Sequence, residues 1–383
     1  MALSESLTDK FEREMLLPDS GIQSHASNLL MLENGDTLCT WFSGTEEGKA
    51  DITIFLSRMK NGESKWSQSV AMSNNPGRSD QNPVLFLAPN NDIWLLYTSQ
   101  EGGNQDTAII QYRVSKDGGK TWTKQTNLFP KETGLFIRHP LVVTDEGAWI
   151  LPLYHCVIKN DGKPWDGSYD YSCVRVSTDE GKTWKEYVVP ESKGCVQMSI
   201  VKLLNKQGYV GLFRSRWADF IYRSFSKDGI HWSAPTPTEL PNNNSSVQAA
   251  LLPDGNLVLA FNKSSAKDAK VRRLSLFSDE TEAKDAPDES KGKVAFWGAP
   301  RAPMTVAISE DFGKTWPYVR NVAEGSGYAL TNNSKDKKNR EFSYPSIKPT
   351  LDGKIDLTFT YFRQNIAFVE LTEEWIKEGK VDK

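Results

Sequence analysis

The amino-acid sequence predicts an all-β fold, a six-bladed β-propeller with four-stranded antiparallel blades. Three observations predict it: a turn-and-strand unit that occurs six times, a Ser-x-Asp-x-Gly-x-Thr-Trp motif with three complete copies, and a composition rich in aromatic residues, glycine and proline. Such a composition is typical of many short strands joined by tight turns. Although 383 residues could hold two or three average domains, the repeats predict one propeller domain over residues 1–383.

The Ser-x-Asp-x-Gly-x-Thr-Trp motif is the first repeat. Complete copies run over 115–122, 177–184 and 309–316, a shortened copy runs from Ser226 to Trp232, and a decayed copy lies at 57–66. Aspartate can bond its own backbone two residues on and glycine accepts a positive φ, so the motif suits a tight hairpin that the tryptophan covers. We therefore interpret Asp117, Asp179 and Asp311 as residues that hold turns rather than as catalytic residues.

The second repeat is a tight turn followed by an apolar strand. The six turns are Asn34-Gly35-Asp36, Asn90-Asn91-Asp92, Glu146-Gly147, Gln207-Gly208, Asp254-Gly255 and Asp352-Gly353. An apolar strand precedes each turn, and a further strand usually leads into the first motif, so each unit is expected to form a sheet of about four strands.

Two departures from the regular spacing have their own interpretation. The turns at Asp254 and Asp352 are 98 residues apart, because a charged insertion at about 263–300 enters blade five. Its first half is expected to be a solvated excursion. The sixth unit lacks the Asp-containing motif, so we expect residues 11–17 (FEREMLL) to supply its outer strand beside Asn365–Leu371.

Composition narrows the classes of partner. A formal net charge of −3 argues against a nucleic-acid binder that relies on phosphate neutralisation. The opening residues lack the apolar stretch of a signal peptide, and no run approaches a membrane span. We therefore expect a soluble protein, cytoplasmic as written or secreted or periplasmic if a signal was removed. Nothing in the sequence predicts an oligomeric state.

The cysteines and histidines predict no metal site and no cofactor. Cys39, Cys156, Cys173 and Cys195 have no C-x-x-C spacing and are expected to be buried thiols, with a Cys156–Cys173 bond as the alternative in an oxidising compartment. A metal site built from His25, His139 and His155 is disfavoured, because no carboxylate accompanies them at a recognisable spacing.

The first strands of the six units predict a ring of polar side chains at the propeller axis. Alignment of these strands on their turns places one polar residue or phenol from each unit in the ring: His25, Gln81, Arg138, Gln197, Ser246 and Tyr344. A wet channel explains Gln81, Gln197 and Ser246 equally well. Arg138 and Tyr344 cost more to place without a partner, which favours a functional role for these two.

The loops between strands two and three should lie on the same face as this ring. They carry Glu46, Glu47, Glu101, His155, Arg214, Arg216, Asn262 and Arg363. Guanidinium groups suit bidentate recognition of carboxylate, sulfate or phosphate, and Trp217 could offer a sugar a stacking face. Each residue alone could belong to a surface charge pair. Their convergence predicts a polar pocket for a carbohydrate that bears an acidic group.

The chain is similar to the sialidase superfamily of Asp-box, or BNR-repeat, propellers over essentially its whole length. The similarity rests on the complete motifs, the six units, and Glu341-Phe-Ser-Tyr344-Pro-Ser-Ile before the last turn. It implies that Tyr344 is a nucleophile, a known exception among glycosidases, with Glu341 as its base and Glu47, or its rival Glu46, as the acid. In a regular strand, however, a three-residue offset points Glu341 and Tyr344 to opposite faces, so the base role requires an irregular chain.

The resemblance also implies three arginines that grip a sugar carboxylate. Arg216 resembles one of them, and Arg273 or Arg301 could supply another. Sialidases carry Arg-Ile-Pro or Arg-Leu-Pro at the start of the first blade, whereas this chain has His25-Ala-Ser27. One arginine is therefore missing from its place, and Arg138 or Arg363 would have to approach from another blade.

Three functions follow from these residues. The first is an exo-acting, sialidase-like glycoside hydrolase on an acidic sugar at the end of a glycan. Tyr344, Glu341 and Glu47 or Glu46 would be catalytic there, and the binding residues would be Arg138, His139, Arg214, Arg216, Arg363, Gln81, Gln197 and Trp217. The second is a polysaccharide lyase in which Arg138 neutralises a uronate, while Tyr344 and His25 or His139 transfer the proton. The third is a non-catalytic glycan-binding propeller, with Glu46, Glu47 and Glu341 pointing away from the ligand.

Overall fold

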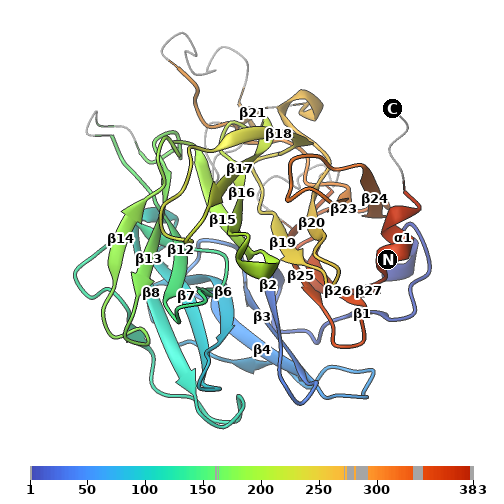
Figure 1. The fold of residues 1–383 in the computed structure, drawn as a ribbon, viewed down its shortest axis with the longest axis horizontal. Helices are drawn as coiled ribbons and strands as arrows, with labels where there is room; N and C mark the ends of the chain where they lie inside the picture. The colour runs from blue at the N-terminus through green and yellow to red at the C-terminus, as the bar shows by residue number, and fades with distance from the viewer. Residues whose placement is uncertain are drawn as a thin grey trace.

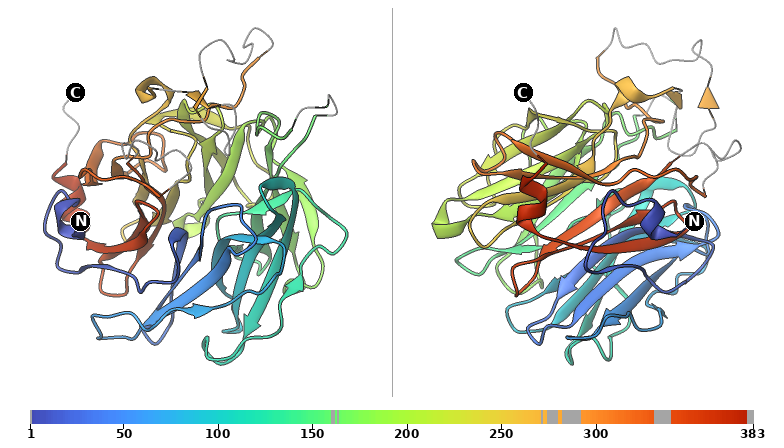
Figure 2. Two further views of the ribbon diagram at one scale, coloured as in Figure 1. Left: turned by 180° about the vertical axis from the view of Figure 1, so that it is seen from behind. Right: turned by 90° about the vertical axis from the view of Figure 1, so that its right-hand side faces the viewer.

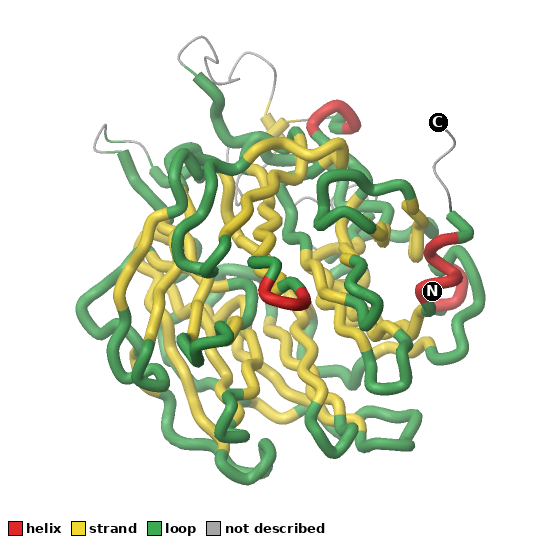
Figure 3. The backbone as a smooth tube through the Cα atoms, in the orientation of Figure 1, coloured by secondary structure: helices red, strands yellow, loops and turns green. Residues whose placement is uncertain are grey.

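The computed structural model describes residues 2–159, 162, 164–270, 272–273, 280–281, 292–330 and 340–379. Six small antiparallel sheets stand around a central axis, so the predicted six-bladed β-propeller is confirmed (Figure 1). Strands account for most of the regular structure, and helices are limited to short segments (Figure 3).

Blades one to three take their strands in chain order, with the first strand nearest the axis (Figure 1). Blade one is β2 (Gln23–Met31), β3 (Thr37–Gly44), β4 (Thr53–Met59) and β5 (Val70–Ala71); blade two is β6 (Ser79–Leu87), β7 (Ile93–Glu101), β8 (Asn104–Ser115) and β9 (Thr126–Asn127); blade three is β10 (Leu135–Ile137) with β11 (Val142–Val143), β12 (Trp149–His155), β13 (Tyr171–Ser177) and β14 (Lys185–Val188). In blade three the first strand is split, because β10 and β11 both pair with β12.

Blades four to six complete the ring. Blade four is β15 (Cys195–Lys202), β16 (Tyr209–Ser215), β17 (Phe220–Ser226) and β18 (Thr236–Pro241); blade five is β19 (Gln248–Leu251), β20 (Leu257–Asn262), β23 (Met304–Ser309) and β24 (Tyr318–Ala323); blade six is β25 (Phe342–Pro349), β26 (Ile355–Tyr361), β27 (Asn365–Leu371) and β1 (Glu14–Leu16). The short helices are η1 (Leu3–Glu5), η2 (Leu204–Lys206), η3 (Ala266–Asp268) and α1 (Glu373–Lys377).

Blade six confirms the predicted closure of the ring. Its outermost strand is β1, which pairs antiparallel with β27 so that Glu14 lies opposite Val369 and Leu16 lies opposite Ala367. The N-terminal segment and the last strands lie side by side in the turned view (Figure 2). This pairing explains why the sixth unit needs no Asp-containing turn, since its fourth strand comes from the other end of the chain.

The hydrophobic core lies between neighbouring blades. One cluster joins Phe42 and Ile54 of blade one to Leu95 and Tyr97 of blade two. Because each blade packs against two neighbours, both faces of its inner strands are buried, and β26 is buried along its whole length. Burial on both faces explains why the second strands of blades two to five begin with nearly unbroken apolar runs, whereas β26 also buries Asp356, Thr358 and Thr360.

The Asp-box turns, residues 115–122, 177–184, 226–232 and 309–316, join the third and fourth strands of blades two to five. In the first of them, Asp117 Oδ1 accepts hydrogen bonds from the backbone N–H groups of Lys120 and Thr121, and Asp117 Oδ2 accepts one from Thr121 Oγ1. Trp122 Nε1 donates to the carbonyl of Gly119, which has φ of 85°. This geometry confirms the structural interpretation of the motif.

The charged insertion lies between β20 and β23 of blade five. Residues 274–279 and 282–291, which hold much of its charged first half, lie outside the described residues. Before them, Arg272 and Arg273 in β21 (Arg272–Arg273) pair with β22 (Glu280–Thr281). The described second half returns toward blades three and four and contributes to the site described below.

The cysteines and the helices add two further facts. All four cysteines are buried and free, as predicted, and Cys156 is not bonded to Cys173. Within the described part of the chain, every helix is too short or too polar to cross a membrane.

Candidate active site at the propeller axis

Tyr344 lies on a β-bulge in the first strand of blade six. The pairing of β25 with β26 shifts register between Ser343 and Ser346, and Tyr344 has φ of 51°. Gln197 in blade four lies on a similar bulge with φ of 52°. A bulge changes the direction of a side chain relative to its strand. Contacts of Tyr344 with residues of blades one, three and four place its ring at the axis.

The register of the predicted polar ring is wrong by one residue in blades one and two. There the positive φ belongs to Ala26 (60°) and Asn82 (50°), each one residue after the predicted ring member, His25 or Gln81. The aligned triplets contain no signal for the position of a bulge. His25 still reaches the centre, because its ring centroid lies 4.2 Å from that of Tyr344.

The hydroxyl oxygen of Tyr344 is held by blade four. It lies 2.6 Å from Arg214 Nη1 and 3.4 Å from Gln197 Nε2. The guanidinium carbons of Arg138 and Arg301 lie 5.1 and 5.5 Å from the centre of its ring. Burial alone would raise the pKa of Tyr344, but the charges of Arg214 and Arg301 lower it below its ordinary value.

Glu341 is a buried carboxylate that gathers two arginines. Its Oε1 accepts hydrogen bonds from Arg301 Nη1 at 3.0 Å, Arg363 Nε at 3.1 Å and Ser343 Oγ at 2.6 Å. Burial would raise its pKa, but Arg363 and Arg301 outweigh burial and lower the pKa to about 2. Glu341 is therefore ionised at neutral pH.

The bulge supplies the irregular chain that a pairing of Glu341 with Tyr344 requires. Both residues contact Arg301, and Glu341 Oε1 lies 3.9 Å from His25 Nδ1. However, the hydrogen bonds of the Tyr344 hydroxyl in the described chain go to Arg214 and Gln197, not to Glu341. In this geometry Glu341 orients Arg301 and Arg363.

The structure distinguishes the two glutamates of the first-blade loop. Glu47 forms an ion pair with Arg363 Nη1 and exposes 15% of its side chain. Glu46 lies 4.0 Å from Lys49 and exposes 36%. Glu47 therefore belongs to the axial group of charges, whereas Glu46 lies in a more exposed, local pair.

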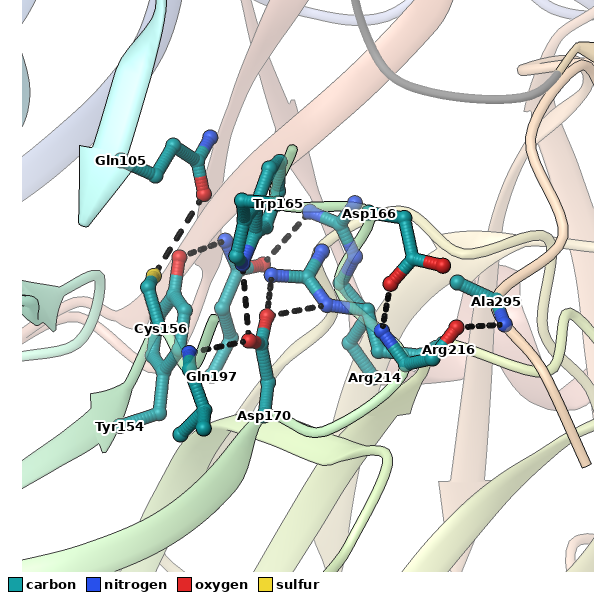
Figure 4. A network of polar contacts seen from close by, with 12 residues as sticks. Gln105, Tyr154, Cys156, Trp165, Asp166, Asp170, Gln197, Arg214, Arg216 and Ala295 are labelled. Atoms are coloured by element: carbon teal, nitrogen blue, oxygen red, sulfur yellow. Dashed lines mark hydrogen bonds and ion pairs between the residues drawn. The ribbon is translucent and has the colours of Figure 1, made fainter. Parts of the chain in front are cut away.

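Arg216 is fixed by an aspartate that the sequence reasoning missed. Its Nε and Nη2 donate to Asp170 Oδ2 at 3.0 and 2.7 Å (Figure 4). The other carboxylate oxygen of Asp170 accepts from Trp165 Nε1 at 2.9 Å and from the backbone N–H of Val157 at 3.1 Å. Asp170 is fully buried, and this pairing neutralises the charge of Arg216.

Arg214 differs from Arg216 in having neutral partners. Its Nε donates to Asn244 Oδ1 at 2.7 Å, and its Nη1 donates to Gln197 Oε1 at 3.3 Å as well as to Tyr344. Burial lowers the pKa of Arg214 to about 10, which leaves it charged at neutral pH.

Arg138 fastens the walls of the channel. Its three nitrogens donate to Ser246 Oγ and to the carbonyls of Ser27 and Pro345, at 3.0, 3.1 and 3.0 Å. Blades one, five and six are thus joined by one side chain from blade three. Each of its three nitrogens makes one of these bonds, so Arg138 supports the walls of the channel while its guanidinium carbon lies 5.1 Å from the centre of the Tyr344 ring.

The second half of the blade-five insertion contributes Trp297, another residue that sequence reasoning missed. Trp297 Nε1 donates to the carbonyl of Asp166 at 2.9 Å, and the N–H of Phe296 donates to the carbonyl of Arg216 at 2.8 Å. The guanidinium carbons of Arg214 and Arg216 lie 5.7 and 5.3 Å from the Trp297 ring. The insertion therefore packs against the arginines of blade four.

The remaining predicted residues have mixed placements. Gln81 Nε2 bonds Ser79 Oγ at 3.0 Å within its own strand, and His139 Nδ1 lies 3.3 Å from Gln248 Nε2. Trp217 packs on Gly194, where an added Cβ would lie 2.2 Å from the indole. Trp217 is half-buried, and no ring or ion contact links it to Tyr344 among the residues described.

One group of described side chains has the composition of a metal site. Ligand atoms of His155, Cys173 and Glu186 lie within 4.8 Å of one another in blade three. Glu186 also bonds Arg175 Nε at 2.8 Å, and burial raises the pKa of the Cys173 thiol. A neighbouring guanidinium and a protonated thiol both oppose cation binding at this group.

We define the axial cluster as the charged residues at the centre and the tyrosine between them: Arg138, Arg214, Arg216, Arg301, Arg363, Glu47, Asp170, Glu341 and Tyr344. Its five guanidinium groups exceed its three carboxylates by two positive charges. Tyr344 and Arg214 expose only 6% and 2% of their surface, so the cluster is more enclosed than the predicted pocket. Its more exposed side chains are Glu47 and Arg301, at 15% and 11%, so solvent approaches from blades one and five.

Comparison with known proteins decides the family. The family model of the BNR repeat-like domain matches residues 35–357. The chain belongs to this BNR repeat-like family. The predicted resemblance to the sialidase superfamily is thus confirmed, and a comparison with curated proteins found no match.

Several solved structures share the fold of this BNR repeat-like chain. A Hadza microbial sialidase is 16% identical, with a TM-score of 0.67 over 93% of this chain and 67% of its own. An intramolecular trans-sialidase from Ruminococcus gnavus is 12% identical, with a TM-score of 0.65 and full coverage of both chains. A protein of unknown function from Dyadobacter fermentans is 14% identical, with a TM-score of 0.66 over 95% of this chain and 98% of its own. At these identities the likeness concerns the fold.

Proposed function

We propose that this protein is an exo-acting glycoside hydrolase, sialidase-like, that cleaves an acidic sugar from the end of a glycan with Tyr344 as its nucleophile. The observation that carries the proposal is the buried Tyr344 hydroxyl, 2.6 Å from Arg214 in a cluster with two excess positive charges. Tyrosine nucleophiles are a known exception among glycosidases. A reacting tyrosine surrounded by arginines suits a substrate that is itself an anion.

The charges of the axial cluster support an acidic substrate. The five guanidinium groups of the cluster exceed its three carboxylates, so the cluster as a whole favours a ligand that brings a negative charge. Arg301 and Arg363 are both oriented by hydrogen bonds to Glu341. An electrostatic frame of this kind stabilises charge that develops on the sugar without having to rearrange during the reaction.

The roles of the other residues follow from their positions. In the first step the Tyr344 oxygen, as the phenolate, bonds to the anomeric carbon while the bond to the leaving oxygen breaks. The leaving oxygen keeps the bonding electron pair and takes a proton from Glu47, which acts as the general acid. In the second step water attacks the same carbon, Glu47 accepts the water proton, and Tyr344 leaves. Of the predicted residues, Glu47 is the carboxyl group of the cluster with the greatest exposure.

Tyr344→Phe tests the nucleophile. On methylumbelliferyl conjugates of sialic acid and of uronic acids, we expect the variant to lose about 10³-fold or more in turnover, because a phenyl ring cannot form the covalent intermediate. Tyr154→Phe is the matched control: it also removes a buried hydroxyl near Gln197, at 3.5 Å, but one that has no role in the reaction. Unchanged turnover in Tyr344→Phe would refute the assignment.

A polysaccharide lyase is the second candidate, and one observation favours it. No carboxylate of the described chain bonds the Tyr344 hydroxyl, which suits a tyrosine that removes a proton beside a uronate and returns one to the leaving oxygen. The product of that reaction is unsaturated and absorbs ultraviolet light, whereas hydrolysis creates no such chromophore. Incubation with uronic-acid glycans, followed by absorbance and by reducing-end release, distinguishes the two reactions.

A further inference from the structure

The oxygen of Tyr344 is contacted by hydrogen-bond donors alone within the part of the chain that the structure describes. Arg214 offers N–H groups and no acceptor, at 2.6 Å. Gln197 also presents its amide nitrogen, at 3.4 Å, because its amide oxygen is taken by Arg214 Nη1 at 3.3 Å. If the amide were flipped, its nitrogen would face the Arg214 donor. A neutral phenol here has a proton without an acceptor, whereas a phenolate accepts from both groups.

The distribution of charge in the axial cluster also favours a phenolate at Tyr344. Within the axial cluster, Arg216, Arg301 and Arg363 each face a carboxylate, but Arg138 and Arg214 bond only neutral acceptors besides Tyr344. An isolated buried cation is costly, so an anion is expected beside each of them. The guanidinium carbons of these two arginines lie 5.1 and 5.8 Å from the centre of the Tyr344 ring. A phenolate at Tyr344 would lie between the two unpaired charges.

We propose that Arg214 activates Tyr344 directly, by holding it as the phenolate, so that the tyrosine reacts without a carboxylate base. Glu341 is then a positioning residue for Arg301 and Arg363. The use of the phenolate in catalysis rests on the proposed function, but its formation does not, because it occurs in the protein without substrate.

The groups that face Tyr344 from each neighbouring element agree with this assignment. Arginine charges come from four of them: Arg214 of β16, Arg138 after β10, Arg301 before β23 and Arg363 after β26. His25 of β2 is neutral, because burial and then Arg363 and Arg301 lower its pKa well below the ordinary value. Burial and the negative charge of Glu47 oppose the ionisation of Tyr344. The remaining neighbours, Gln197 of β15 and Tyr154 of β12, are uncharged.

The test is a spectrophotometric titration of the full chain without substrate, which follows the near-ultraviolet absorbance of phenolate. We expect one tyrosine of the wild-type protein to ionise well before the others, and Tyr344→Phe to remove that transition alone. A wild-type titration that matches Tyr344→Phe throughout would overturn the proposal, whatever the enzyme activity. Because Tyr344→Phe removes a single oxygen, this comparison does not depend on a disruptive variant.

A matched pair of arginine variants isolates Arg214. Arg214→Met should move the early transition toward the range of the other tyrosines, and Arg214→Lys should move it less. Arg216→Lys is the control, because Arg216 is equally buried and adjacent but bonds Asp170 instead of Tyr344. An early transition that persists in Arg214→Met would assign the ionisation to other charges and overturn the role of Arg214. Failure of every glycan conjugate to turn over would count against the proposed function alone.

Discussion

The Asp-box turns and the axial cluster use the same kinds of polar side chain in opposite ways. In the turn at 115–122, Asp117 bonds groups at most four residues away. At the axis, Arg138 reaches carbonyls 111 and 207 residues away, in blades one and six. The turns are repeated and lie at the surface, whereas each member of the cluster occurs once and is largely buried.

This difference shows where one substitution can affect the whole ring. The aspartate of an Asp-box turn stabilises the link between two strands of its own blade, so we expect its loss to leave the other blades intact. The axial cluster links side chains from five blades, every blade except blade two. Removing one member therefore leaves its hydrogen-bond or ion-pair partners in other blades unsatisfied. We therefore expect equal chemical changes to have unequal effects at the two places.

Asp170→Ala should have the largest effect on stability. It leaves Arg216 buried without a counter-charge, and removal of one partner from a buried ion pair costs about 3–5 kcal/mol. Chemical denaturation measures the free energy of unfolding, with Asp117→Ala as the matched aspartate. Equal losses in the two variants would contradict the distinction between cluster and turn.

The acid side of the pH–stability curve should depend on Glu341. Its pKa falls from 4.5 to about 2 on folding, so the stabilisation is fully present above about pH 4.5 and is lost as pH falls through about 2. A lowering from 4.5 to about 2 corresponds to about 3 kcal/mol. The free energy of unfolding, measured from about pH 2 to pH 5, should depend less on pH in Glu341→Gln than in the wild-type protein. A Gln variant with the full wild-type slope would show that other carboxylates carry the effect.

Asp179→Ala in the second complete Asp-box turn should have the smallest effect. The aspartate accepts bonds from the N–H and hydroxyl of Thr183 at an exposed site, so its loss is expected to lower stability by less than either change above. Combined with Asp311→Ala in blade five, the two losses should add, because the sites are distant and share no partner. Unfolding of the double variant tests this, and a loss well beyond the sum would indicate that the turns are coupled through the ring.

The same contrast explains what could be predicted from the sequence. The turns and strands were predictable because their bonds are local and recur, and the absent sixth motif even predicted the closing strand around Glu14. The position of the bulge in blades one and two could not be predicted, because it depends on the pairing between strands. Ala26 and Asn82 have the positive φ there; alanine rarely adopts it, and asparagine does so more often but also occurs at many other positions of this chain.

The missed site residues have a similar cause. Asp170 lies in the loop after β12, where the sequence reasoning selected His155, and only the fold brings it to Arg216. Trp297 belongs to the second half of the blade-five insertion, for which no placement was predicted, and it packs inward against Arg216. Arg214 was predicted at the site from its loop position, but its contact with the Tyr344 hydroxyl depends on the bulge in β25.

The pairing of β1 with β27 also sets an order of events during synthesis. Glu14 emerges from the ribosome long before its partner Val369 has been translated. Blades one to five can assemble in turn as they appear, but β1, which precedes them in the sequence, is among the last strands to be docked. Until then β1 has unpaired backbone groups, and so does the edge of blade six when it forms, which is a template for pairing with another chain. The most aggregation-prone moment should therefore come once β27 has been translated, when the ring is complete except for the docking of β1.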